Sequence, residues 1–173
     1  KDDSVRICVD DRALNQVTVK KSYPLPRLDD IFGKLRHAKY FSNIYLRSGY
    51  HQVRLDKESI HLTAFRTRYG LFEFLVLPFG LTNAPAIFMS LMKDVFRNHL
   101  DKFIHVYLDD IFIYSPDFET HLVHLRIVLE LLRNHQLYAK LSKCTFFQEA
   151  VDYLGHVISS DGFSIEQTKV EAI

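Results

Sequence analysis

The segment HVYLDDIFIY, residues 105–114, places two adjacent aspartates, Asp109 and Asp110, between two apolar and aromatic runs. Neighbouring carboxylates repel each other and are costly to bury, so a positive partner should lie against them. A hard divalent cation such as Mg²⁺ is one candidate, because it binds one or two protein carboxylates and leaves its other positions to water and phosphates. The pair is therefore either part of a phosphoryl-transfer site or a solvated turn.

The runs on either side of the aspartates, FIHVYL and IFIYS, predict a tight β-hairpin. Successive side chains of a strand point to opposite faces, so one aspartate should dominate a shared site unless the turn bends the backbone. We expect further strands at KYFSNIYL and YHQVRL, and a hairpin formed by LTAFRT and FEFLVL. The segment VDYLGHVISSDGFSI predicts a last hairpin that turns at Asp161 and Gly162.

Apolar residues at helical spacing predict a helix in RLDDIFGKLRHA and a second one after LPFGLTNAP, beginning near Thr82 or Asn83. A longer helix is predicted in DFETHLVHLRIVLELLRN, with an apolar stripe formed by Phe118, Leu122, Leu125, Leu129 and Leu132. At the start of the chain we expect a short strand over Val5 to Val9, followed by polar turn residues. Strands and helices do not alternate regularly, which favours the α+β class.

The composition is that of an ordinary soluble domain: 173 residues, 47% hydrophobic and 25% charged. The chain is long enough for one domain, or for one domain with a small lobe. A net charge of +1 gives no bulk argument for nucleic-acid binding. The two cysteines, Cys8 and Cys144, lie far apart, which argues against a zinc site or a disulfide framework. No apolar run approaches the roughly 20 residues of a membrane span.

Seven blocks of the sequence occur in an order and spacing that point to one family: RICVDDRALNQVT, YPLPRLDDIFGKL, FSNIYLRSGYHQVRL, TAFRTRYGLFEFLVLPFGLTNAPAIFMSLM, YLDDIFIYS, LYAKLSKCTF and YLGHVIS. Together they resemble the fingers and palm of a reverse transcriptase from a gypsy-type LTR retrotransposon. The resemblance implies an α+β fold in which an antiparallel palm sheet is backed by helices. It also implies that residues 1–173 are a fragment without thumb, connection and RNase H.

The resemblance implies an RNA-directed DNA polymerase domain of a retrotransposon polyprotein that works by two-metal nucleotidyl transfer. Its cofactor would be Mg²⁺ or Mn²⁺, and its partners dNTPs, an RNA or DNA primer-template and other segments of the polyprotein, with no membrane. The implied location is intracellular, either in a cytoplasmic retrotransposon particle or in the nucleus.

The family's metal ligands are carried over onto Asp109 and Asp110, but one further ligand is missing. The family has an aspartate in the strand written I-D-L-R-S-G-Y-H-Q, and here that strand reads NIYLRSGYHQ, with Tyr45 at the position. A phenol has a reference pKa near 10 and a single oxygen, so it cannot bridge two cations. We therefore expect weak metal binding and impaired polymerisation, with Asp56 and Glu58 unable to replace the ligand. The alternative is a non-catalytic domesticated or structural module that binds nucleic acid or protein.

If the resemblance holds, Tyr45 and Asp109 should lie on neighbouring strands with side chains on one face, and Tyr50 should lie near them. Tyr50 matches the aromatic residue under the incoming sugar, although ordinary strand packing remains an alternative. Four other residues match the nucleotide-binding set: Lys1, Arg6, Phe79 and Gly80. Lys143 matches the lysine that protonates pyrophosphate, or is a solvated surface lysine. The primer grip is matched by Tyr153, Leu154, Gly155 and His156.

Two further features leave alternatives open. Asp11 stands where the family commonly has an aromatic residue in VDYRALN, and it is either an exposed substitution or a damaging one. His121 and His124 share one face of the predicted long helix, but no third ligand is in view, so we expect an exposed helix face and no metal site.

Overall fold

The computed structural model describes residues 9–23, 33–153, 156–160 and 162–165. The chain divides into two compact units, one comprising residues 1–23 and 48–90 and the other residues 24–47 and 91–173. None of the described helices is long and apolar enough to cross a membrane.

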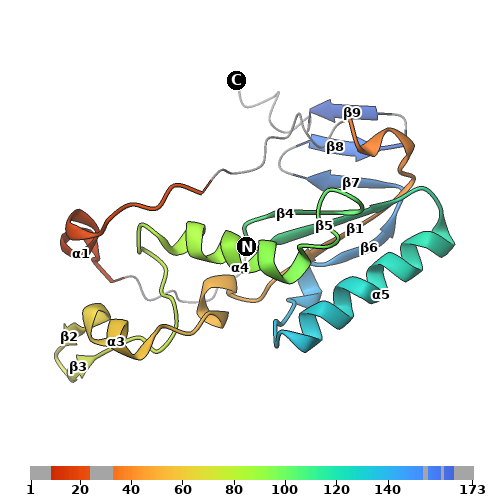
Figure 1. The fold of residues 1–173 in the computed structure, drawn as a ribbon. Coiled ribbons are helices and arrows are strands. Elements are labelled where there is room, and N and C mark those ends of the chain that lie inside the picture. Colours follow the sequence, from red (N-terminus) through yellow and green to blue (C-terminus); the bar gives the residue numbers. More distant parts are fainter. Residues whose placement is uncertain (1–8, 24–32, 154–155, 161, 166–173) are drawn as a thin grey trace. The chain divides into compact units, whose positions relative to one another are not determined.

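The first unit is built from short elements (Figure 1). A two-stranded sheet pairs Phe65 with Phe72 and Thr67 with Gly70. A hairpin is therefore present and contains part of LTAFRT, but the second predicted strand is wrong, because FEFLVL contributes only Phe72 to β3. Its elements are α1 (Arg12–Val17), a 3-10 helix (Gly49–Gln52), α3 (Lys57–Ile60), a 3-10 helix (His61–Thr63), β2 (Phe65–Thr67), β3 (Gly70–Phe72) and the beginning of α4 (Ala84–Phe96).

Two other expectations for this unit are wrong. Residues 12–17 form helix α1 where polar turn residues were expected. The segment YHQVRL is mostly a 3-10 helix, and only an isolated bridge between Arg54 and Val76 is extended pairing. A left-handed backbone at Ser48, with φ of +49°, turns the chain before this helix, and such a turn leaves no signal in the hydrophobic pattern. The expected strand over Val5 to Val9 lies mainly outside the described residues.

The second unit contains a four-stranded antiparallel sheet in the order β4-β5-β1-β6 and a three-stranded sheet in the order β7-β8-β9. The structure confirms the predicted strands in KYFSNIYL, FIHVYL and IFIYS and the two predicted long helices, α4 and α5. In RLDDIFGKLRHA, the described residues contain only a 3-10 helix at Leu35–His37. The elements are β1 (Tyr40–Tyr45), β4 (Ile104–Tyr107), β5 (Asp110–Ser115), α5 (Phe118–Asn134), a 3-10 helix (Leu141–Lys143), β6 (Thr145–Gln148), β7 (Ala150–Tyr153), β8 (His156–Ser159) and β9 (Gly162–Ile165).

Helix α5 packs on one face of the four-stranded sheet, against β1 and β5 (Figure 1). Asp117 caps its first turn, because its carboxylate accepts the backbone N–H of Thr120 at 2.8 Å. The buried residues of α5 are His121, Leu125, Val128 and Leu132. The predicted stripe is therefore rotated from the buried face: Phe118, Leu122 and Leu129 are 47%, 42% and 44% exposed.

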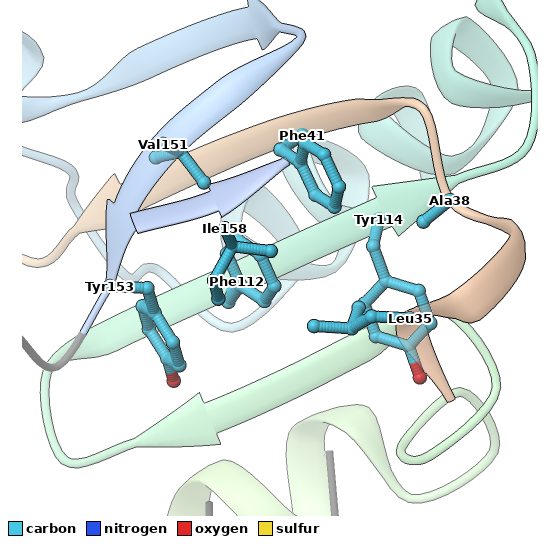
Figure 2. Packing of buried hydrophobic residues seen from close by; sticks show 8 residues of the cluster. All are labelled: Leu35, Ala38, Phe41, Phe112, Tyr114, Val151, Tyr153 and Ile158. Carbon is cyan, nitrogen blue, oxygen red and sulfur yellow. The ribbon is translucent and has the colours of Figure 1, made fainter. Parts of the chain in front are cut away.

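The β7–β9 sheet covers the other face of the four-stranded sheet and forms a second core layer. Phe41, Phe112 and Tyr114 from β1 and β5 pack against Val151, Tyr153 and Ile158 from β7 and β8 (Figure 2). The rings of Phe41 and Phe112 stack with centroids 5.7 Å apart. The alternation of side chains along β1 and β5 thus decides which residues meet the helix and which meet the second sheet.

Candidate active site

The two aspartates lie at the tip of the β4–β5 hairpin. Tyr107 pairs with Asp110 across the two strands, so Leu108 and Asp109 form the turn and Asp110 opens β5. Leu108, the first residue of the turn, has a φ of +54°, and Asp109, the second, has a negative φ. A positive φ followed by a negative φ is typical of a type II′ hairpin turn. The backbone N–H of Leu46 donates to the carbonyl of Asp109 at 3.0 Å, which fixes the turn against the end of β1. Asp109 is exposed and Asp110 is half-buried.

Tyr45 lies on the strand next to the hairpin and pairs directly with Asp110. Residues opposite each other in an antiparallel pair project to the same face, so the phenol and the carboxyl group share a face. The expectation that position 45 shares the sheet of the YLDD hairpin is confirmed. Its strand partner is Asp110, however, and Asp109 belongs to the turn. Tyr50 lies in the other unit.

Asp110 is flanked by two tyrosines, Tyr45 on β1 and Tyr107 on β4. Burial and, after it, the charge of Asp109 raise the pKa of Asp110 to about 7. The charge of Lys143 and hydrogen bonding by Tyr45 act in the opposite direction. Burial and the nearby Asp110 carboxylate raise the pKa of Tyr45, so its phenol stays protonated and can donate to Asp110. Among the described residues, the positive charge that acts on Asp110 is that of Lys143.

Lys143 is held near the end of β1 by a short backbone segment. The N–H of Lys140 donates to the carbonyl of Tyr45 at 2.8 Å, and the N–H of Lys143 donates to the carbonyl of Lys140 at 2.9 Å. The thiol of Cys144 donates to the same Lys140 carbonyl at 3.3 Å. Lys143 is exposed, and its charge acts on Asp110.

These residues suit one divalent cation poorly and two not at all. No group of three His, Cys, Asp or Glu side chains that could hold a metal ion occurs in the described part of the chain. Asp109 and Asp110 supply oxygen ligands, but the third position holds a phenol that is hydrogen-bonded to Asp110. Asp56 and Glu58 lie in the other unit, at the start of α3. The donor set therefore does not match a two-ion centre.

The residues matched to nucleotide binding form a group within the first unit. The ring of Tyr50 packs against Phe79, with centroids 5.1 Å apart, and against Phe88, with centroids 5.5 Å apart. Gly80 has a φ of +107°, a conformation that favours glycine. Lys1 and Arg6 lie outside the described residues. Tyr50 lies in a 3-10 helix and not in a strand, and its ring packing leaves both interpretations of this residue as predictions.

Asn15 holds the Gly80 turn within the same unit, and Asp11 lies against Gly80. The amide of Asn15 donates to the carbonyl of Gly80 and accepts the N–H of Thr82, both at 2.8 Å. A Cβ atom on Gly80 would lie 2.8 Å from Oδ2 of Asp11. That oxygen is buried without a hydrogen-bond partner in the described part of the chain, and burial raises the pKa of Asp11. Asp11 is therefore not an exposed substitution. The role of Asn15 was missed, although its amide in DRALN was a visible signal.

The hairpin matched to the primer grip is described only in part, because Leu154 and Gly155 lie outside the described residues. Tyr153 is 1% exposed; its ring stacks on Phe112 at 4.4 Å and meets His105 edge-on at 6.1 Å. Burial, and then the charge of Asp110, raise the pKa of Tyr153. His156 is half-buried and pairs with Tyr153. The side chain of Tyr153 therefore belongs to the core beside Asp110.

The two helix histidines lie on the other face of the sheet, and the expectation that they are exposed is wrong. His121 is 0% exposed, with Nε2 2.7 Å from Oγ of Ser42 and Nδ1 2.8 Å from Oγ of Ser115. His124 also contacts Oγ of Ser115, at 2.8 Å. Burial lowers the pKa of His121 to about 4. This network joins α5 to β1 and β5.

Residues 1–158 match the family described as "Reverse transcriptase (RNA-dependent DNA polymerase)". The chain belongs to the reverse transcriptase family. It is 39% identical over 97% of its length to the Retrovirus-related Pol polyprotein from transposon gypsy of Drosophila melanogaster, and 52% identical over 73% of its length to an RNA-directed DNA polymerase homolog of Oenothera berteroana, of which it covers 92%. It spans 16–17% of the Drosophila polyproteins that it matches.

The fold agrees with this family. The structure of the foamy viral protease-reverse transcriptase in complex with RNA/DNA hybrid superposes with a TM-score of 0.85 at 28% identity, covering 96% of this chain and 22% of the viral one. The resemblance to gypsy-type polyproteins and the α+β palm and fingers fold are thereby confirmed. This chain is a reverse transcriptase domain of the kind found in transposon polyproteins.

Proposed function

We propose that this reverse transcriptase domain descends from a two-metal RNA-directed DNA polymerase and that Tyr45 impairs its chemistry. Residues 1–173 would form the fingers and palm, with dNTPs and an RNA or DNA primer-template as substrates. The observation that carries the proposal is the pairing of Tyr45 with Asp110, since the family's additional aspartate would stand directly opposite that carboxylate.

The physical reason for the impairment is uncompensated charge. In the two-metal mechanism one ion activates the primer hydroxyl and the other stabilises the departing pyrophosphate, whereas here only Asp109 and Asp110 would be available to hold Mg²⁺ or Mn²⁺. Two dications about 4 Å apart repel by roughly 4 kcal/mol even at the dielectric constant of water, and by more near a protein surface. Carboxylates that bridge both ions offset this repulsion. The phenol of Tyr45 is uncharged, so it cannot offset the repulsion between the ions. It also donates a hydrogen bond to the Asp110 carboxylate.

The other residues in this proposal bind and orient the substrates. Tyr50 and Phe79 would form the floor under the sugar of the incoming nucleotide, and Gly80 would allow close approach of its backbone. Lys1 and Arg6 would hold the triphosphate. The exposed ammonium of Lys143 would lie near the pyrophosphate and supply a proton to it. The β7–β8 hairpin, with Tyr153, Leu154, Gly155 and His156, would support the primer terminus through its backbone.

Primer extension tests the proposal. Tyr45→Asp, made in a chain that carries the thumb of the same element, should raise the extension rate at least about 100-fold, because it restores a first-sphere metal ligand. Tyr45→Phe is the matched control: it removes the hydroxyl and adds no carboxylate, so it should give no gain. Adding Asp109→Asn to Tyr45→Asp should abolish the gain. Equal rates for the Tyr45 protein and for Tyr45→Asp would refute the proposed role of this position.

A second candidate is a non-catalytic module that binds nucleic acid or protein through the retained surface. It is favoured by the observation that Asp110 already has partners within the chain, namely the hydroxyl of Tyr45 and the charge of Lys143. A domain of this kind should bind a primer-template equally well with EDTA and with Mg²⁺. A large gain in affinity on adding Mg²⁺ would count against it and for the polymerase.

A further inference from the structure

The β2–β3 hairpin of the first unit ends in a fixed two-residue tip. Thr67 pairs with Gly70, which leaves Arg68 and Tyr69 as the turn, and Gly70 has a φ of +141°. Oγ1 of Thr67 accepts the backbone N–H of Tyr69 at 3.1 Å and donates to the carbonyl of Gly70 at 3.4 Å. The conformation of the tip is therefore set before any ligand arrives, which lowers the entropic cost of binding.

The tip exposes a cation and an aromatic ring together. Tyr69 is 76% exposed, and the guanidinium carbon of Arg68 lies 4.6 Å from the centroid of its ring. Arg66 is also exposed, and residues 65–72 contain no Asp or Glu. Neither arginine takes part in an ion pair within the described residues. Leu71, opposite Arg66, adds an apolar surface that is 66% exposed.

An aromatic ladder anchors the other side of the hairpin inside the same unit. Phe65 packs on Phe72 at 5.8 Å and on Phe74 at 5.4 Å. His51 continues the ladder, since its ring lies 6.5 Å from Phe74 and 4.9 Å from Phe79, which in turn contacts Tyr50. The exposed tip is thus connected through packed rings to the residues that match the nucleotide site. Figure 1 shows the hairpin beside α3.

We propose that the Arg68–Tyr69 tip is a binding site for single-stranded nucleic acid, in which Tyr69 stacks on an unpaired base and Arg66 and Arg68 contact phosphates. Base–aromatic stacking is sequence-tolerant and requires a base that is free of its neighbours, which favours a single strand over a duplex. An apolar protein partner is disfavoured, because it would bury two cations without counter-ions. Identification of this strand as the template ahead of the primer terminus rests on the proposed function.

Binding of a fluorescein-labelled single-stranded 12-mer, followed by fluorescence anisotropy in EDTA, tests the site without any catalysis. Tyr69→Ala should raise Kd at least about 5-fold, because stacking of one base is lost. Tyr69→Phe should retain the affinity, since the ring remains. Arg66→Ala with Arg68→Ala should reduce the slope of log K against log salt by about 1.4, the value for two single-strand phosphates.

The matched controls lie outside the hairpin. Leu62→Ala removes an apolar side chain that is 53% exposed in the same unit, and Arg126→Ala removes an exposed arginine of α5; neither should change Kd. An unchanged Kd for Tyr69→Ala, or an equal loss of affinity for a blunt duplex of the same sequence, would overturn the proposal. So would a Tyr69→Ala protein that keeps its affinity for the 12-mer but loses self-association in sedimentation. Because no extension is measured, failure here leaves the Tyr45→Asp experiment unaffected.

Discussion

Lowering the pH from 7.5 to 4.5 should remove a stabilising contribution that one buried side chain, His121, makes to the second unit. Its imidazole lies between the hydroxyls of Ser42 and Ser115 and is 0% exposed, so protonation would place a charge in the core. Burial, and after it the charge of His124, lower the pKa of His121 from 6.5 to about 4. Between these values His121 binds more protons in the unfolded chain than in the folded one, so its contribution to the free energy of unfolding falls as the pH falls.

The magnitude follows from the width of that window. A difference of roughly 2.5 pKa units corresponds to roughly 3 kcal/mol, which is lost in full only below pH 4. At pH 5 the loss should already be roughly 2 kcal/mol. Asp10 and Asp117, whose pKa values are lowered by hydrogen bonds, lose their contributions only near and below their unfolded pKa of about 3.9. Asp110, whose pKa is raised to about 7, also titrates between pH 7.5 and 4.5, and its contribution has the opposite sign: it stabilises the folded chain as the pH falls. The contribution of His121 is therefore obtained by comparing the parent protein with a variant that lacks this imidazole.

Urea denaturation at several pH values between 7.5 and 4.5 measures this dependence. His121→Gln keeps a polar group between the two serines and cannot titrate, so on lowering the pH its free energy of unfolding should fall less, or rise more, than that of the parent protein. His135→Gln is the matched control, because His135 is exposed at the end of α5. The comparison uses the slopes, so a general loss of stability in His121→Gln does not affect it. Parallel curves for the parent protein and His121→Gln would refute the argument.

Three further outcomes are expected. Asp110→Asn should raise the free energy of unfolding at pH 8 by roughly 1–2 kcal/mol and by less at pH 5, because it removes a half-buried charge beside Asp109; urea denaturation at both pH values checks this. Gly80→Ala should lower stability by roughly 1–3 kcal/mol in thermal melts, because its Cβ would meet Asp11 and its φ is positive. Phe112→Ala should cost roughly 3–5 kcal/mol of unfolding free energy by urea denaturation, whereas Leu129→Ala, 44% exposed, should cost little.

Long elements with a strong period were predictable from the sequence. The apolar runs around the aspartates fixed the β4–β5 hairpin, and α4 and α5 followed from helical spacing. Short elements were not: YHQVRL was predicted as a strand, yet its first three residues belong to the 3-10 helix Gly49–Gln52, which follows a left-handed backbone at Ser48. The conformation of one residue decides such a segment, and periodicity over a few residues cannot report it.

The buried face of α5 illustrates a second limit. The spacing of His121, Leu125, Val128 and Leu132 is as helical as that of the predicted stripe, but hydrophobicity ranks a histidine below Phe118 or Leu122. The two ring nitrogens of His121 form hydrogen bonds with Ser42 and Ser115. These serines come from two different strands, so the sequence alone does not show that they lie next to His121. Burial of a polar side chain depends on partners that only the fold brings together.

Position 45 was the most informative site feature in the sequence, although only the strand register gives its partner. An aspartate there would face Asp110 across an antiparallel pair, with Cβ atoms about 4.5–5.5 Å apart, and Asp109 would stand beside them. Without a cation, three carboxylates in one place would repel each other. Tyr45 replaces one charge with a hydrogen-bond donor to Asp110, whose pKa is already raised by burial. At position 45, a tyrosine therefore favours the stability of the metal-free protein, whereas an aspartate favours metal-dependent catalysis.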